Sequence, residues 1–239
     1  TYTETVRKYN VTWVDGNGET LKTEQVAYGA TPSYTGDTPT KTATNQYTYT
    51  FNNTWTPAIA TVTGNATYTA QFDSTVNKYT VTWANDDGTT LKTEQVEYGT
   101  VPAYTGDTPT KEGNAQYSYT FNAWTPKVVE VTEDVTYTAT YTQSTNKYTV
   151  TWKNYDGTVL ETDKDVEYGT VPTYNGETPT KLSDAQYDYT FAFWTTEIAA
   201  VTGDVTYTAN YDSVLREYTI SFVNEDGTVL QSGFVKYGE

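Results

Sequence analysis

The stretch Lys78-Tyr79-Thr80-Val81-Thr82-Trp83 decides the fold, because it is one of four copies of a single pattern. The other copies occupy residues 8–13, 147–152 and 217–222, so the steps are 70, 69 and 70 residues (8 to 78, 78 to 147, 147 to 217). Internal repeats of this kind determine the architecture before any single motif does. The chain therefore divides into the tail of a preceding repeat (1–6), repeat 1 (7–76), repeat 2 (77–145), repeat 3 (146–215) and the N-terminal part of repeat 4 (216–239).

The first half of each repeat has the pattern of a β-hairpin. In repeat 2, Tyr79, Val81 and Trp83 alternate with threonines, which is the period of two expected for a half-buried strand. The turn residues 85–88 follow, and residues 91–98 return as a second strand.

The second half of the repeat predicts two more strands, at residues 117–121 and 135–141 of repeat 2. Residues 99–116 before them are too long for a hairpin loop, and Pro102 and Pro109 restrict any helix there to a turn or so. We expect a β-β-crossover-β-β unit, one sheet with the crossover packed on its aromatic face. The fold class is mostly β, with small modules repeated in tandem.

The second strand differs between copies. In repeat 2, Leu91 and Thr93 lie in one phase of the alternation, and Val96 and Tyr98 lie in the other. Repeat 3 has one more residue here, and its residues 160–168 stay in phase. An odd residue in one strand of a pair indicates a β-bulge, so we expect the copies to differ locally at this edge.

Composition excludes several classes of function. The 14 basic and 30 acidic residues give a net charge of −16, which disfavours nucleic acid and anionic membranes as partners. No apolar run approaches the length of a membrane span. Without histidine or cysteine, the usual catalytic bases and nucleophiles are missing. We therefore predict no enzyme activity, no cofactor and no metal site.

The motifs of repeat 2 resemble a known family when they are taken as a set. They are Tyr-Thr-Val-Thr-Trp (79–83), Asp-Gly-Thr (87–89), Val-Glu-Tyr-Gly-Thr (96–100), Trp-Thr-Pro (124–126) and Val-Thr-Tyr-Thr-Ala (135–139). This set resembles the B-repeats of Gram-positive surface proteins, the internalin-type or Listeria–Bacteroides repeats, and is similar to mucin-binding-protein repeats. The resemblance implies small β-grasp-like modules in an elongated beads-on-a-string array, with the first and last strands of each module as parallel neighbours at the centre of the sheet. It also implies a longer extracellular protein that is secreted or attached to the cell surface or cell wall.

Three functions follow from this sequence. The leading one is a structural stalk or spacer that projects a functional domain, in which five-residue linkers (73–77, 142–146 and 212–216) join neighbouring repeats. An alternative is an adhesive module that binds a host glycan or surface protein through Trp55, Trp124 and Trp194, whose other interpretation is core packing. A second alternative is the subunit of a self-assembling extracellular filament.

Overall fold

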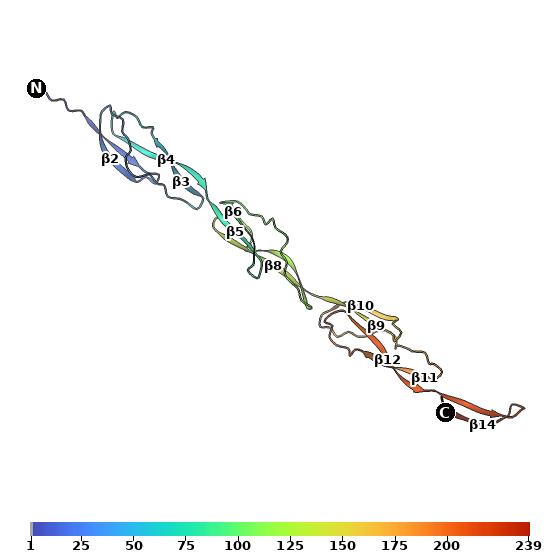
Figure 1. Ribbon diagram of the computed structural model, residues 1–239. Helices are drawn as coiled ribbons and strands as arrows, with labels where there is room; N and C mark the ends of the chain where they lie inside the picture. Colours follow the sequence, from blue (N-terminus) through green and yellow to red (C-terminus); the bar gives the residue numbers. More distant parts are fainter. Residues whose placement is uncertain (1) are drawn as a thin grey trace. The chain divides into compact units, whose positions relative to one another are not determined.

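The computed structural model describes residues 2–239, which form strands joined by turns and irregular segments (Figure 1). Repeat 1 contains β1 (Lys8–Val14), β2 (Thr20–Ala27), β3 (Tyr47–Thr56) and β4 (Ala66–Val76). Repeat 2 contains β5 (Lys78–Ala84), β6 (Thr90–Glu97), β7 (Tyr117–Thr125) and β8 (Val135–Thr145). Repeat 3 contains β9 (Lys147–Lys153), β10 (Val159–Glu167), β11 (Tyr187–Thr195) and β12 (Val205–Leu215). Residues 216–239 contain β13 (Glu217–Val223) and β14 (Val229–Lys236).

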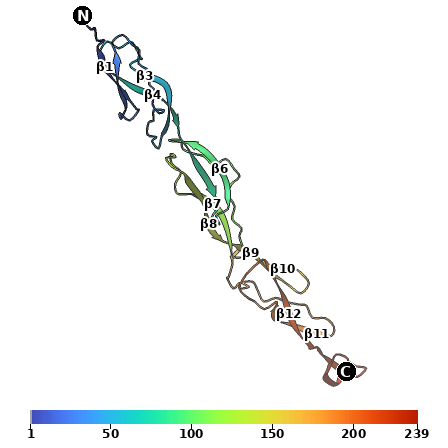
Figure 2. The ribbon, with the colours of Figure 1, turned by 60° about the vertical axis from the view of Figure 1, so that its left-hand side comes forward.

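Each complete repeat folds into its own four-stranded sheet (Figure 2). The strand order is β2-β1-β4-β3 in repeat 1, and the equivalent order holds in repeats 2 and 3. The first and last strands are the central pair and run parallel, with Trp13 opposite Tyr68 in repeat 1. This confirms the predicted β-β-crossover-β-β unit and its tandem repetition.

Contacts along the chain divide it into two compact units. The first holds residues 1–109 and 121–140, and the second holds residues 110–120 and 141–239. The sheet of repeat 1 lies in the first unit, and the sheet of repeat 3 and the β13–β14 hairpin lie in the second. The sheet of repeat 2 has strands that continue from one unit into the other.

The crossover between the second and third strands is irregular chain. Two main-chain hydrogen bonds hold the start of the crossover of repeat 1, from Gly29 N to Val62 O (2.8 Å) and from Val62 N to Ala30 O (2.9 Å). The same pair of bonds recurs at Val131 and at Val201. These bonds satisfy main-chain groups that a helix would otherwise pair. Among residues 2–239, no helix is long and apolar enough to cross a membrane.

The core of each repeat is small and aromatic. Val11, Trp13, Val62 and Tyr68 form the buried core cluster of repeat 1, and the equivalent four positions form the core clusters of repeats 2 and 3. A repeat of this length buries only about 60% of its unfolded surface, so large aromatic side chains supply much of the stabilising area.

The predicted five-residue linkers are wrong. β4 continues to Val76 and β5 begins at Lys78, so Asn77 alone separates the two strands. Residues 73–76 are strand because they pair with Tyr47–Thr50 of β3. Their side chains alternate without an apolar pattern, which is why the sequence carried no strand signal there.

The copies differ in the second strand as predicted, but the irregular copy is repeat 3 and not repeat 2, whose alternation changes phase in the sequence. β10 has a register shift between Asp163 and Val166, and Asp165 there has a positive φ of 58°. β6 pairs with β5 in regular register from Lys92 to Glu97. The additional residue of repeat 3 is therefore accommodated as a bulge in one copy.

Candidate functional site

An aromatic cluster occupies the same position in every complete repeat. In repeat 2, the ring of Trp83 lies 4.9 Å from Tyr137, 4.8 Å from Trp124 and 5.5 Å from Tyr104, between centroids. Tyr104 comes from the crossover and the other residues from the sheet, so the crossover packs on the aromatic face as predicted. Tilted and edge-on pairs at these separations stabilise beyond the area that they bury.

The central tryptophan of each cluster donates a hydrogen bond to a carboxylate on the neighbouring strand. Trp13 Nε1 donates to Glu24 (3.0 Å), Trp83 Nε1 to Glu94 (2.9 Å) and Trp152 Nε1 to Asp163 (2.9 Å). These tryptophans are almost fully buried, so their indole N–H groups need a partner inside the protein. A charged acceptor makes the bond stronger than one between neutral groups.

A lysine completes the pair in repeats 1 and 2. Lys92 Nζ lies 2.7 Å from Glu94 Oε2, and Lys22 is 2.8 Å from Glu24. Two hydrogen bonds lower the pKa of Glu24 and of Glu94 below the usual glutamate value. The bond from the lysine has the larger effect and the bond from the tryptophan the smaller one. Both carboxylates therefore stay ionised at neutral pH, as acceptors of the indole proton.

The sequence alternation pointed to other residues on this strand. Leu91 is more than a third exposed, whereas Lys92, Glu94 and Val96 are the half-buried positions of β6. A tryptophan with an acid eleven positions later in three repeats was the available signal for this pair. We missed it because acidic residues are normally assigned to the solvent face.

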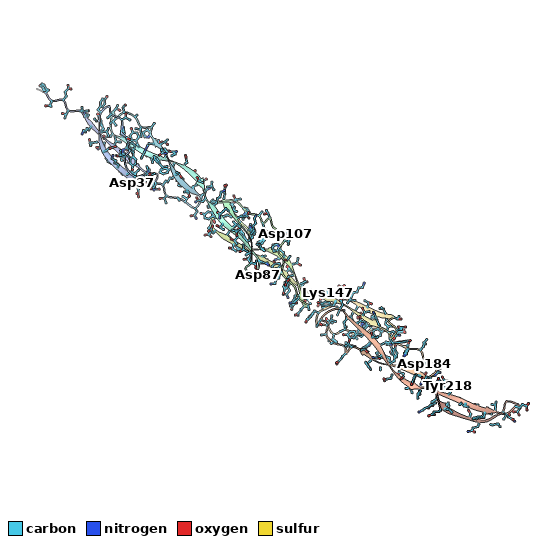
Figure 3. The ribbon with its side chains drawn as sticks, viewed as in Figure 1. Asp37, Asp87, Asp107, Lys147, Asp184 and Tyr218 are labelled. Atoms are coloured by element: carbon cyan, nitrogen blue, oxygen red, sulfur yellow. The ribbon has the colours of Figure 1, made fainter. Side chains whose placement is uncertain are left out.

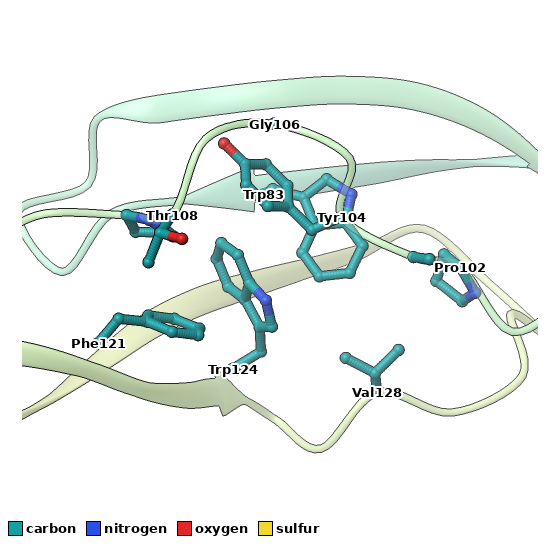
Figure 4. Close-up of a pocket in the computed structure, with 10 residues that line it drawn as sticks. Trp83, Pro102, Tyr104, Gly106, Thr108, Phe121, Trp124 and Val128 are labelled. Atoms are coloured by element: carbon teal, nitrogen blue, oxygen red, sulfur yellow. The ribbon is translucent and has the colours of Figure 1, made fainter.

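A cavity of about 390 Å³ lies beside the aromatic cluster of repeat 2 (Figure 4). Phe121, Trp124 and Val128 line it from the β7 side, and the crossover lines it with Pro102 and Tyr104. Trp124 projects between Phe121 and Val128 toward the cluster (Figure 4). An apolar, aromatic wall of this kind accepts an apolar or ring-shaped group.

Gly106 shapes the wall of the cavity. A Cβ at this position would clash with the Tyr104 hydroxyl, so any side chain there would displace the tyrosine ring. The glycine therefore allows the Tyr104 ring to fold back over the crossover. Gly36 and Gly176 are in the same relation to Tyr34 and Tyr174.

The three tryptophans singled out as ligand-contact candidates occupy equivalent places. Trp55, Trp124 and Trp194 are half-buried near the ends of β3, β7 and β11, and each makes an edge-on contact with the central tryptophan of its repeat. They are therefore part of the core packing and keep partly exposed surface as well. The structure does not bring the three together, because each belongs to its own sheet.

The second recurrent arrangement lies where one repeat meets the next, and we call it the joint. At the first joint, Asn77 N donates to Gln46 O (2.9 Å), and Asn77 Nδ2 donates to Thr44 O (2.8 Å) and Asn45 O (3.0 Å). Tyr79, the first inward residue of the following repeat, donates its hydroxyl to Asn45 O (2.7 Å). The connecting residue is thus bonded to the preceding repeat through its main chain and its side chain.

The same bonds recur at the next two joints. Asn146 N donates to Gln116 O (2.8 Å), and Tyr148 donates its hydroxyl to Ala115 O (2.5 Å). At the third joint, Arg216 N donates to Gln186 O (2.9 Å), and the Tyr218 hydroxyl donates to Ala185 O (2.5 Å). Arg216 Nη1 also donates to Asp184 O (2.9 Å). Asp184 and Tyr218, on the two sides of this joint, are labelled in Figure 3.

A capped turn presents the accepting carbonyls at each joint. Asp184 Oδ1 accepts from the main-chain N–H groups of Gln186 (2.8 Å) and Tyr187 (2.7 Å). The bond from Tyr187 is the largest of the hydrogen bonds that lower the pKa of Asp184. Asn114 caps the equivalent turn of repeat 2 in the same way. A side chain that fixes its own turn holds the carbonyls in place for the next repeat.

The acidic turns of the hairpins serve the main chain. Asp87 Oδ1 accepts from Thr89 N (2.8 Å), and Asp156 Oδ1 accepts from Thr158 N (2.9 Å). Among residues 2–239 there is no group of three or more acidic, histidine or cysteine side chains placed to hold a metal ion. The hydrogen bonds of Asp87 and Asp156 make these carboxylates caps of the turn backbone.

Comparison with known proteins finds similarity to a solved structure of the Streptococcal High Identity Repeats in Tandem (SHIRT) domains 3-4 from a cell surface protein. The sequences are 11% identical, 59% of this chain and 99% of that chain are covered, and the TM-score is 0.28. No family model and no curated protein match the sequence.

Proposed function

We propose that this chain is a structural spacer, a tandem-repeat stalk of a secreted or cell-surface bacterial protein that projects a functional domain. The joint is the observation that carries the proposal. One residue separates the last strand of a repeat from the first strand of the next, and hydrogen bonds hold that residue on both sides. A short connection that is bonded in this way limits hinge freedom, which a spacer requires.

Two further features support a spacer. In tandem-repeat proteins, stability is approximately the sum of each repeat and its interfaces with neighbours, so a joint that recurs gives every repeat the same support. The net charge of −16 adds mutual repulsion, which favours extension over collapse onto neighbouring repeats.

Small-angle X-ray scattering tests the proposal. Three repeats of roughly 35 Å each, placed end to end, have a radius of gyration of about 30 Å, whereas a compact chain of this length has one of about 18 Å. We expect the larger value, and we expect it to fall when Tyr79, Tyr148 and Tyr218 are all changed to Phe.

The matched control changes one tyrosine per repeat outside the hydroxyl bonds of the joints. Tyr28→Phe, Tyr98→Phe and Tyr168→Phe together remove the same number of hydroxyl groups and should leave the scattering curve unchanged. A compact particle for the unaltered chain, or identical curves for both triple variants, contradicts the spacer.

A second function is favoured by the cavity of repeat 2, whose wall includes Trp124. The exposed part of this indole offers a flat apolar surface on which a sugar ring of a host glycan could stack. A glycan array probed with the full chain tests this adhesion function, with Trp124→Ala as the altered chain. Binding that is lost in Trp124→Ala and kept in Leu182→Ala, which changes a highly exposed residue of repeat 3, supports adhesion.

A further inference from the structure

The sequence contains asparagine followed by glycine twice, as Asn17-Gly18 in repeat 1 and as Asn175-Gly176 in repeat 3. An asparagine side chain reacts most readily with its own main chain in this dipeptide, because glycine has no side chain to hinder the attacking nitrogen. All four residues are exposed to water. Their hydrogen bonds differ, and this difference predicts which of the two asparagines is modified.

In repeat 1, the carboxamide of Asn17 is held beside a weakly bonded nitrogen. Asn17 Oδ1 accepts from Thr42 N (2.9 Å), and Asn17 Nδ2 donates to Asp15 Oδ2 (3.3 Å). The nitrogen that would attack, Gly18 N, donates to Asp15 O over 3.4 Å, which is long for a hydrogen bond. The proton of Gly18 N is therefore held weakly, whereas the carboxamide oxygen already has a donor.

A donor on this oxygen favours deamidation. When Gly18 N attacks Cγ of Asn17, negative charge develops on Oδ1, and a main-chain N–H that already points at Oδ1 stabilises this charge. The N–Cγ bond forms, the Cγ–Nδ2 bond breaks and ammonia leaves. Water takes the proton of Gly18 N and supplies one to the departing nitrogen. A further water molecule then opens the cyclic succinimide to aspartate or isoaspartate.

In repeat 3, a carboxylate holds the equivalent nitrogen. Glu161 Oε2 accepts from Gly176 N (3.0 Å) and from Asn175 N (2.8 Å), and Glu161 Oε1 accepts from Asn175 Nδ2 (3.3 Å). A negative charge this close opposes removal of the Gly176 proton, which would create a second negative charge beside the first. The hydrogen bond that the attacking nitrogen must give up is also charge-assisted, and therefore stronger than the bond of Gly18 N.

The hairpin turns of the other copies already carry aspartate at the position of Asn17. In each of them asparagine lies two residues before the aspartate: Asn85 and Asp87, Asn154 and Asp156, Asn224 and Asp226. In repeat 1 the two residue types are exchanged, as Asp15 and Asn17. An aspartate at position 17 would therefore face the carboxylate of Asp15, where the other copies have an amide.

We propose that Asn17 is a modification site, at which spontaneous deamidation introduces a carboxylate into the turn between β1 and β2, and that Glu161 protects Asn175 from the same reaction. The reaction needs only water, so the modified fraction rises with the age of the molecule. Repulsion between the new carboxylate and Asp15 weakens the turn. Repeat 1 is therefore the repeat that this chemistry destabilises.

Peptide mapping by mass spectrometry tests the site in the full chain. The chain is incubated at neutral pH in heavy-oxygen water, so that deamidation during the incubation labels the modified residue. We expect Asn17 to convert about tenfold faster than Asn175, since a hydrogen bond to a charged acceptor costs more to break than one to a neutral acceptor. A peptide of residues 13–20, treated in parallel, gives the rate without the fold.

Two glutamates of repeat 3 provide the matched variants. Glu161→Gln keeps the size of the side chain and removes its charge, and it should accelerate the conversion of Asn175 about tenfold. Glu177→Gln removes a charge next to Gly176 and keeps the acceptor of Gly176 N, so it should change that rate less than about threefold.

Asn17→Asp copies the product and tests its effect on the fold. Hydrogen exchange of the Trp13 amide should become about fivefold faster, from repulsion between two like charges about 4 Å apart in water. The same change in an Asp15→Asn chain recreates the pair that repeat 2 has as Asn85 and Asp87, and should leave the exchange rate unchanged.

Each outcome decides the proposal. Faster conversion at Asn17 than at Asn175, with acceleration of Asn175 in Glu161→Gln and not in Glu177→Gln, supports it. Equal or reversed rates at the two asparagines, equal rates in the two glutamate variants, or conversion of the peptide without conversion of Asn17 in the chain overturns it. An Asn17→Asp effect that persists in the Asp15→Asn chain overturns the repulsion.

Discussion

The pairing of a buried tryptophan with a carboxylate leads to a double-mutant prediction in repeat 2. Trp83→Phe removes the donor to Glu94, and Glu94→Gly removes the acceptor, so the double variant carries the pair that the C-terminal hairpin has as Phe222 and Gly233. If this hydrogen bond couples the two positions strongly, the double variant should lose much less free energy of unfolding than the sum of the losses in the two single variants.

The magnitudes follow from the burial of the pair. Trp83→Phe loses a hydrogen bond to a charged group, worth about 1.5–3 kcal/mol, and leaves a cavity that costs about 1 kcal/mol. Glu94→Gly leaves the N–H of the 1% exposed Trp83 without its acceptor, at about 1–3 kcal/mol. It also places glycine in a strand, at about 0.5–1 kcal/mol. Because the bond is counted in both single variants, we expect a coupling energy of about 1.5 kcal/mol.

Native-state hydrogen exchange of the Val81 and Val131 amides measures the stability of repeat 2 separately from its neighbours. The control cycle combines Trp83→Phe with Gln95→Gly, which places glycine in the same strand on the opposite face. That cycle should be additive within about 0.5 kcal/mol. Additivity in the Glu94 cycle as well would refute the coupling.

Three more predictions concern charge, turns and joints. The pKa values of Glu24 and Glu94 are lowered on folding, so the ionised carboxylates stabilise the fold fully above about pH 4.3. This stabilisation is lost as pH falls through the pKa values of the folded state. Melting temperatures measured from pH 7 to pH 2 should therefore drop below about pH 4.3, and a flat profile would contradict this. Gly88→Ala, at a φ of 86°, should cost about 1 kcal/mol in chemical denaturation, whereas Gly64→Ala, in open space without a positive φ, should cost less than about 0.5 kcal/mol. Asn77→Asp should destabilise the first joint by about 1–2 kcal/mol, because a carboxylate, which only accepts hydrogen bonds, would face two carbonyl oxygens. Hydrogen exchange of the Tyr79 amide should become faster in this variant and stay nearly unchanged in Asn77→Arg, which keeps a donor.

Much of the repeat fold could be predicted because its strongest signals are local. Tyr79, Val81 and Trp83 alternate cleanly, and the structure places them in a central strand with Val81 and Trp83 buried. The parallel pairing of the first and last strands is a long-range property, and it came from the family resemblance. Nothing in the alternation itself distinguishes a parallel from an antiparallel neighbour.

The joints could not be predicted, because their decisive groups are main-chain carbonyls. Asn45 O and Ala115 O accept the tyrosine hydroxyls, and any residue at those positions would offer the same acceptor. The strand extension beyond Phe72 was missed for a related reason, since it depends on hydrogen bonds to β3. Sequence patterns report side-chain burial, and these features are determined by backbone pairing.

Comparison among the copies recovers what single positions conceal. From repeat 3 to the hairpin, Trp152 becomes Phe222 while Asp163 becomes Gly233, so donor and acceptor are replaced as a pair. At the joint, Asn146 becomes Arg216, yet both side chains donate to the first carbonyl of the capped turn, at 2.7 and 2.9 Å. The change from Asn146 to Arg216 keeps a hydrogen-bond donor although the side chain differs in size and charge. The change from Trp152 to Phe222 removes a donor, and the carboxylate that accepted from it is absent as well. The joint tyrosines Tyr79, Tyr148 and Tyr218 are identical in all three joints, whereas other positions of the joint and of the tryptophan–carboxylate pair change in partner-matched ways. Comparing the interactions as well as the residues therefore explains why those positions can change.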